Sequence, residues 1–116
     1  MHPRAQVIYY ALMDDAVNSH LIERGVGRAH PRYVVESACR YLTPLSYPHP
    51  VDVGLSITKL GNSSVVYSIG LFAAESQHPA ALGKFVHCYI NEETGRPKPM
   101  DEEVRRVLAE LVSPPA

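Results

Sequence analysis

The sequence VIYYALMDDAVNSHLIERG, residues 7–25, has the spacing of a helix that is apolar on more than one side. At about 100° per residue, apolar side chains gather on one side and also interrupt the opposite side. The first set is Tyr9, Tyr10, Met13, Val17 and Leu21, and the second is Ile8, Ala11, Leu12 and Ile22. Such a helix needs cover from other elements. We expect it to end at Gly25, which can adopt the left-handed conformation.

Four strand-like segments follow this helix. They are residues 32–42, 51–60, 63–72 and 81–91. Each is rich in β-branched or apolar residues and is bounded by Gly, Pro or Asn. Gly61-Asn62 predicts a tight hairpin turn with Gly61 in the left-handed conformation. Regular alternation predicts that Val34 shares a face with Arg40, and that Ile57 shares a face with Lys59.

A short amphipathic helix is predicted after the strands. Asp101 has the properties of an N-cap residue, and Glu102 and Glu103 follow in the first turn, where the helix dipole favours anions. Its apolar stripe consists of Val104, Val107, Leu108 and Leu111. The simplest arrangement of these elements is one α+β domain, residues 1–116, in which an antiparallel sheet wraps around the first helix.

The composition excludes several classes of partner. The chain has 116 residues and a net charge of −1, without a Lys/Arg cluster, so we expect no nucleic-acid partner. No apolar run approaches the roughly 18 residues of a membrane span, and the first six residues, MHPRAQ, lack a signal region. We therefore expect a cytoplasmic protein that does not contact membranes. Cys39 and Cys88 lie in separate strand-like segments and should be reduced.

Motifs for phosphate loops, nucleophile elbows and metal sites are absent from the sequence. The six histidines, at positions 2, 20, 30, 49, 78 and 87, include no pair four residues apart, so we expect no metal. For His20 and His87, a partly buried, hydrogen-bonded side chain is a better interpretation than a catalytic one. No cofactor is predicted.

Asp14 is the candidate catalytic residue. On the helical wheel it lies about 20° from Leu21 and about 40° from Tyr10, at the border of the apolar stripe, whereas Asp15 projects away. A carboxylate at this border would be partly desolvated, with a raised pKa suited to a general base or nucleophile. The alternative is that Asp14 only hydrogen-bonds to a neighbouring loop or subunit.

Several motifs, taken in order, resemble the acyl-CoA thioesterases of the 4-hydroxybenzoyl-CoA thioesterase-like hotdog group. They are Tyr9-Tyr10 with Asp14, Ala16, Val17, Asn18 and Leu21-Ile22, then Val35-Glu36 with Arg40-Tyr41 and Pro44, then LGNSSVVY at 60–67 and Thr94-Gly95-Arg96-Pro97. The resemblance implies a hotdog fold, hydrolysis of acyl-CoA to free acid and coenzyme A, and a homodimer or homotetramer. It also implies that coenzyme A enters only as part of the substrate.

The N-terminus departs from this group. Its members typically begin with a strand and a D-x-x-G-H-V-N-N-like turn, whose Asp is catalytic. Counting back from Tyr9 places that Asp before Met1, so the resemblance implies a member that lacks this strand and has impaired activity. The rest of its site would be the helix start, where backbone NH groups of Gln6 and Val7 could polarise a thioester carbonyl.

The resemblance also suggests where coenzyme A would lie. Its phosphates would approach one or more of four residues along the subunit interface. These are Arg40, Lys59, Ser63 and Ser64. Two other functions are compatible with the same scaffold: acyl-CoA binding or an oligomeric interaction module without turnover, and a hotdog dehydratase, for which the expected His and acidic partner cannot be placed.

Overall fold

The computed structural model describes residues 3–27, 30–43, 51–74 and 76–112, with the side chains of the first helix described from Ile8 onward. In chain order the elements are α1 (Pro3–Glu23), β1 (Arg32–Tyr41), β2 (Val51–Leu60), β3 (Ser64–Ala73), β4 (Ala81–Tyr89) and α2 (Glu102–Ala109). The strands form one antiparallel sheet in the order β1-β4-β3-β2. Residues 44–50, which include the Pro44 of the resemblance, lie outside the described residues.

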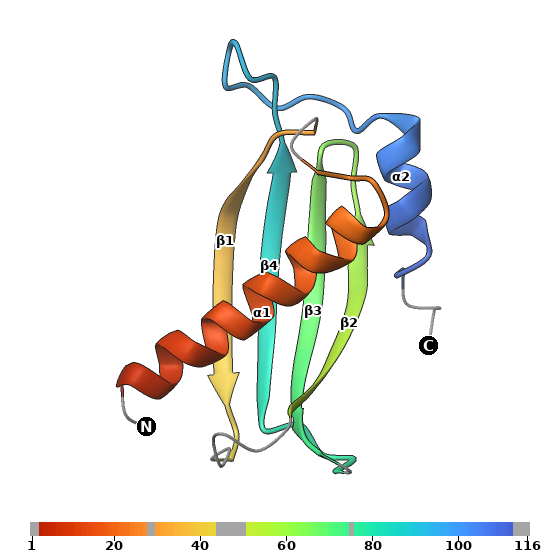
Figure 1. Ribbon diagram of the computed structural model, residues 1–116. Helices are drawn as coiled ribbons and strands as arrows, with labels where there is room; N and C mark the ends of the chain where they lie inside the picture. The colour runs from red at the N-terminus through yellow and green to blue at the C-terminus, as the bar shows by residue number, and fades with distance from the viewer. Residues whose placement is uncertain (1–2, 28–29, 44–50, 75, 113–116) are drawn as a thin grey trace.

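Helix α1 lies diagonally across one face of the sheet, and α2 packs beside β2 (Figure 1). This arrangement of a helix on an antiparallel sheet is the predicted hotdog fold. The side of α1 that faces the sheet is buried. Its residues are Tyr9, Met13, Val17 and Leu21. Ile8, Tyr10 and Ile22 remain exposed, so within one chain the sheet covers one side of the helix rather than wrapping around several.

The two ends of α1 differ in how well the sequence predicted them. The helix begins at Pro3, four residues before the predicted start at Val7, because proline is well tolerated in the first turn. The predicted end is confirmed. Gly25 has a φ of 83°, and the NH groups of Val26 and Gly25 donate to the carbonyl oxygens of Leu21 (2.8 Å) and Ile22 (3.1 Å). This hydrogen-bond pattern is a Schellman motif.

Two strands contain bulges that regular alternation did not predict. In β1, Val34 pairs with His87 and Glu36 pairs with Val86, so Val35 is an extra residue. In β2, Ile57 pairs with Tyr67 and Lys59 pairs with Val66, which makes Thr58 the extra residue. On one side of each bulge, the side chains lie on the face of the sheet opposite to the one that regular alternation predicts. Val34 and Arg40 therefore lie on opposite faces, as do the buried Ile57 and the exposed Lys59.

The β2–β3 hairpin is confirmed, but its predicted turn geometry is wrong. Gly61 is not among the glycines of positive φ, which are Gly25 and Gly95. The reversal uses residues 61–63, with the NH group of Gly61 donating to the carbonyl oxygen of Ser64 at 2.8 Å. The guanidinium of Arg105 in α2 donates to the carbonyl oxygens of Gly61 (2.9 Å) and Asn62 (3.2 Å). These contacts hold the turn without a left-handed glycine.

Helix α2 buries the predicted apolar stripe. Val104 and Leu108 are buried, and Val107 and Leu111 pack against the core from half-buried positions. Asp101 occupies the N-cap position but its side chain caps no NH group of the helix. The NH group of Ile57 donates to the carbonyl oxygen of Leu111 at 2.8 Å. The end of α2 is thereby attached to the outer edge of β2.

The Schellman motif makes a prediction about stability. A Cβ atom at Gly25 would have no neighbour within 4 Å, so the cost of Gly25→Ala arises from the left-handed backbone alone. We expect this substitution to lower the free energy of unfolding by about 1 kcal/mol in urea denaturation. Gly27→Ala is the matched control, because Gly27 also has open space but no positive φ. Equal stabilities of the two variants would contradict the assignment.

Candidate functional site

A pocket of about 630 Å³ lies between the second half of α1, the start of β1 and the end of β4. This volume is within the range of small-molecule sites in proteins. Its lining combines apolar side chains, such as Ile22 and Ile90, with polar ones. The polar residues that matter below are Asp14, Asn18, Arg32 and His87. The pocket is therefore able to accept a largely apolar group with a polar substituent.

Helix α1 contributes Asp14, Asn18 and Ile22 to the pocket. These residues are four positions apart, so they lie above one another on one side of the helix. Asp14 is half-buried, which agrees with its predicted place at the border of the apolar stripe, whereas Asp15 is exposed. The structure thus places Asp14 in the wall of a pocket whose lining is partly apolar and partly polar. Its catalytic role remains a prediction.

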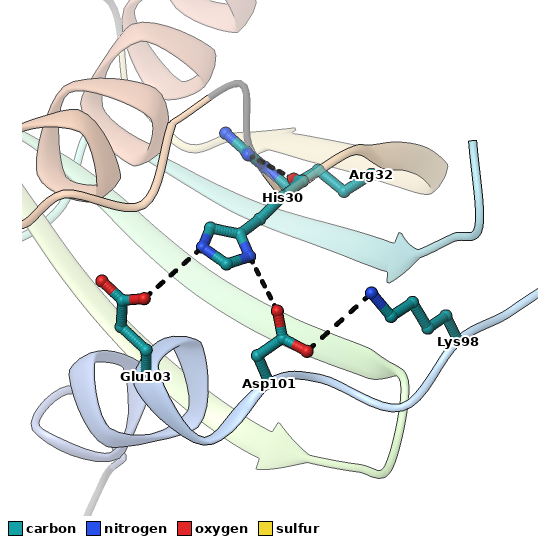
Figure 2. A network of polar contacts seen from close by, with 5 residues as sticks. All are labelled: His30, Arg32, Lys98, Asp101 and Glu103. Atoms are coloured by element: carbon teal, nitrogen blue, oxygen red, sulfur yellow. Dashed lines mark hydrogen bonds and ion pairs between the residues drawn. The ribbon is translucent and has the colours of Figure 1, made fainter.

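Strand β1 contributes Arg32, which sequence reasoning missed. Directly paired residues of neighbouring strands share a face, so Arg32 lies with Tyr89 and Val34 lies with His87 on the face that α1 covers. The Arg32 guanidinium donates to the side-chain oxygen of Asn18 at 2.9 Å and to the carbonyl oxygen of His30 at 3.4 Å. Figure 2 shows its side chain running from β1 towards α1.

His87 on β4 forms the floor of the pocket. It is 1% exposed, and its ring lies edge-on to that of Tyr67, with 5.1 Å between centroids. Burial, reinforced by the positive charge of Arg32, lowers the pKa of His87 to about 4, so the imidazole is neutral at pH 7. Neither ring nitrogen has a hydrogen-bond partner among the described residues. The prediction of a buried histidine is confirmed, but the predicted hydrogen bond is not found in this part of the chain.

His30 also lines the pocket, but its ring nitrogens are engaged outside it (Figure 2). Nδ1 lies 3.3 Å from a carboxylate oxygen of Asp101, and Nε2 lies 3.9 Å from one of Glu103. Lys98 approaches the other Asp101 oxygen at 3.8 Å. This network, rather than helix capping, occupies the Asp101 side chain. It anchors the segment before β1, and hence the backbone oxygen that Arg32 contacts, to the start of α2.

The other predicted site residues lie away from the pocket. Gln6 and Val7 fall inside α1, and in a regular helix the Val7 NH group donates to the carbonyl oxygen of Pro3. The start at Pro3 therefore corrects the expectation that Val7 is at an unpaired helix end, while the oxyanion role itself remains a prediction. Lys59, Ser63 and Ser64 gather around the β2–β3 turn, and Arg40 is exposed on β1 at the opposite edge of the sheet.

Comparison with known proteins gives the family. The chain matches the model of the thioesterase-like superfamily over residues 5–108. It is 40% identical to the PA5185 protein of Pseudomonas aeruginosa strain PAO1, with a TM-score of 0.85 over 92% of this chain and 78% of that one. No curated protein sequence matches it. The chain belongs to the thioesterase-like superfamily.

Two more distant structures share the fold. The SAV2348 protein of Staphylococcus aureus, solved in complex with CoA, is 19% identical, with a TM-score of 0.85 over 100% of this chain and 77% of that one. A 1,4-dihydroxy-2-naphthoyl-CoA thioesterase from Synechocystis is 14% identical, with a TM-score of 0.83 over 98% and 90% of the two chains.

Neither helix in the described part of this chain combines the length and apolar character needed to cross a bilayer.

The buried His87 predicts a pH dependence of stability. Its pKa is lowered from 6.5 to about 4 by folding, so below pH 6.5 the unfolded chain binds a proton that the folded chain does not. The free energy of unfolding therefore contains the full contribution of neutral His87 above pH 6.5. This contribution is lost as the pH falls towards 4, and the total loss is about 3 kcal/mol. His87→Leu, similar in volume, should remove this loss in urea denaturation measured from pH 7 to pH 4. Replacing the exposed His78 by Leu should preserve it, and parallel profiles for wild type and His87→Leu would contradict the assignment.

Proposed function

We propose that this chain hydrolyses acyl-CoA thioesters to a free acid and coenzyme A, with the acyl group in the pocket beside α1. The observation that carries the proposal is a half-buried carboxylate, Asp14, on the wall of a 630 Å³ pocket in a chain of the thioesterase-like superfamily. A half-buried carboxylate in the wall of a pocket is suited to general-base catalysis on a group bound there.

In the proposed reaction Asp14 accepts a proton from a water molecule. The water oxygen attacks the thioester carbon, the carbon–sulfur bond breaks, and the thiolate of coenzyme A leaves and takes up the proton. The products are the acid and the free thiol. Asp14 lies about 10 Å along the helix axis from Val7, so one thioester carbonyl cannot contact both Asp14 and the predicted NH groups of Gln6 and Val7. Asp14 and the helix start are therefore alternative reaction centres within one chain.

Binding of coenzyme A has independent support. SAV2348, which has the same fold, was solved in complex with CoA. In this chain the residues predicted to approach the phosphates form two separate groups, Arg40 on one sheet edge and Lys59 with Ser63 and Ser64 near the other. We expect only one of these groups to serve a given coenzyme A within one subunit. Comparing Arg40→Gln with Lys59→Gln by KM would identify which group does.

The role of Asp14 is tested by Asp14→Asn, which keeps the size of the side chain and removes its charge. General-base catalysis contributes at least about 100-fold to rate, so kcat on a panel of acyl-CoA substrates should fall by that factor. Thiol release can be followed with a chromogenic disulfide. Asp15→Asn is the matched control, because Asp15 is the exposed neighbour on the same helix.

The possible results separate the alternatives. Equal rates for the Asp14 variant and the wild type would remove Asp14 from the mechanism and favour the helix start. Binding of acyl-CoA without thiol release by the wild type would support the alternative function, an acyl-CoA binder. The expectation of impaired turnover remains a prediction, which the wild-type rate in this assay tests.

The free edge of β1 favours an oligomer. Strand β1 is one of the two edge strands of the sheet, and its residues Tyr33, Val34 and Val35 are 57%, 44% and 60% exposed. An unpaired strand edge with exposed apolar side chains is suited to pairing with a second chain. We propose a homodimer through this edge, and a homotetramer is the higher assembly that the sequence also allowed.

Light scattering coupled to size-exclusion chromatography tests the assembly. At micromolar concentration we expect a mass twice that of the 12.8 kDa chain, or four times in a tetramer. Val35→Lys places a charge on the edge and should shift the protein towards monomers. Thr94→Lys, in an exposed loop, is the control. A wild-type monomer would overturn the proposal.

A further inference from the structure

The pocket wall includes one buried polar side chain without a partner, that of His87, and two more lie next to it in the sheet. The two ring nitrogens of His87 and the hydroxyl groups of Tyr67 and Tyr89 are all buried and have no hydrogen-bond partner among the described residues. Each unpaired buried polar group costs about 1–3 kcal/mol. Because His87 lines the pocket and both its ring nitrogens are unpaired, a polar group of a ligand is needed there to complete its hydrogen bonding.

Arg32 supplies the charge at this end of the pocket. Its guanidinium carries five NH donors, and its two hydrogen bonds reach neutral oxygens, those of Asn18 and the His30 backbone. Within the described ranges, no carboxylate lies within 4.0 Å of it. Arg32 therefore faces the pocket without an ion-pair partner among the described residues. A planar guanidinium is also the side chain best shaped to bind a carboxylate through two parallel hydrogen bonds.

The charges near the pocket favour an anion at its buried end. Burial lowers the pKa of His87 and raises that of Tyr89, and the positive charge of Arg32 adds to the first change and opposes the second. Two carboxylates also line the pocket, the half-buried Asp14 and the exposed Glu92, but neither forms an ion pair with Arg32. The pocket therefore has a positive charge at Arg32, next to His87, and negative charges at Asp14 and Glu92 that are not paired with it.

We propose that this buried end binds a carboxylate at the far end of the acyl group, so that the preferred substrates are CoA thioesters of dicarboxylic acids. Arg32 would pair with the carboxylate, and His87 and Asn18 would complete its hydrogen bonds. The inference rests on the proposed function, since it places the thioester beside Asp14. Asp14 and Asn18 are separated by about 6 Å along the helix axis, so a short diacid would span them.

Binding of matched thioether analogues, which cannot be hydrolysed, tests the inference. Adipyl-CoA and hexanoyl-CoA analogues differ only in the terminal carboxylate, and shorter and longer pairs, succinyl with butyryl and suberyl with octanoyl, test the spacing. By calorimetry, we expect the wild type to bind at least one diacid analogue at least tenfold more tightly than its neutral counterpart. Arg32→Gln should abolish this preference while leaving the affinity for the neutral analogue within about twofold.

Two further variants make the result specific. Arg32→Lys keeps the charge but loses the planar fork, and should retain part of the preference. Arg106→Gln removes an exposed arginine on α2, outside the pocket, and should retain all of it. Melting curves of each variant check that the fold is intact, and His87→Leu provides a second route to losing the preference without removing Arg32.

Each other outcome overturns the inference in a recognisable way. If diacid and neutral analogues bind equally and both thioesters are hydrolysed, the proposed function stands and the carboxylate site is wrong. If Arg32→Gln weakens both analogues and free coenzyme A alike, Arg32 contacts coenzyme A instead. If the wild type neither binds the analogues nor hydrolyses the thioesters, the proposed function itself fails.

Discussion

The packing of α1 against the sheet is the interaction on which the rest of the structure depends. Met13 and Val17 are completely buried, and the sheet accommodates this helix at Gly83, where a Cβ atom would overlap the Met13 sulfur. Close approach at this glycine sets the distance between helix and strands. Because Met13 and Val17 face the sheet, Asp14 and Asn18 lie on the adjacent side of α1. Asp14 and Asn18 line the pocket together with residues at the start of β1 and the end of β4.

The bulge at Val35 is the second determinant of the site, because it turns Arg32 and Val34 towards α1. Without it, alternation along β1 would place these side chains on the opposite face of the sheet from Cys39 and Tyr41. The bulge thereby brings a cation next to His87. The unpaired ring nitrogens of His87 at this end of the pocket lower the free energy of unfolding. Such a cost is expected where a binding site, rather than a core, is built.

Periodicity in the sequence was enough to predict both helices, all four strands and the placement of Asp14, because apolar spacing reports directly on which side of an element is buried. It could not reveal the bulges, because each shifts the alternation by one position near the end of a strand, where the few residues beyond it do not show the new phase. Arg32 was missed for that reason, and Lys59 was assigned to the wrong face. Gly61 was misjudged because residue type alone does not fix φ when Arg105 holds the turn.

The central claim is that the acyl group of a CoA thioester occupies the pocket between α1, β1 and β4. A crystal structure with a non-hydrolysable acyl-CoA thioether tests it most directly. We expect density for the acyl chain between Asn18 and His87, with the carbon that replaces the thioester carbonyl nearer to Asp14 than to Val7. An acyl chain bound elsewhere, with this pocket holding only water, would contradict it.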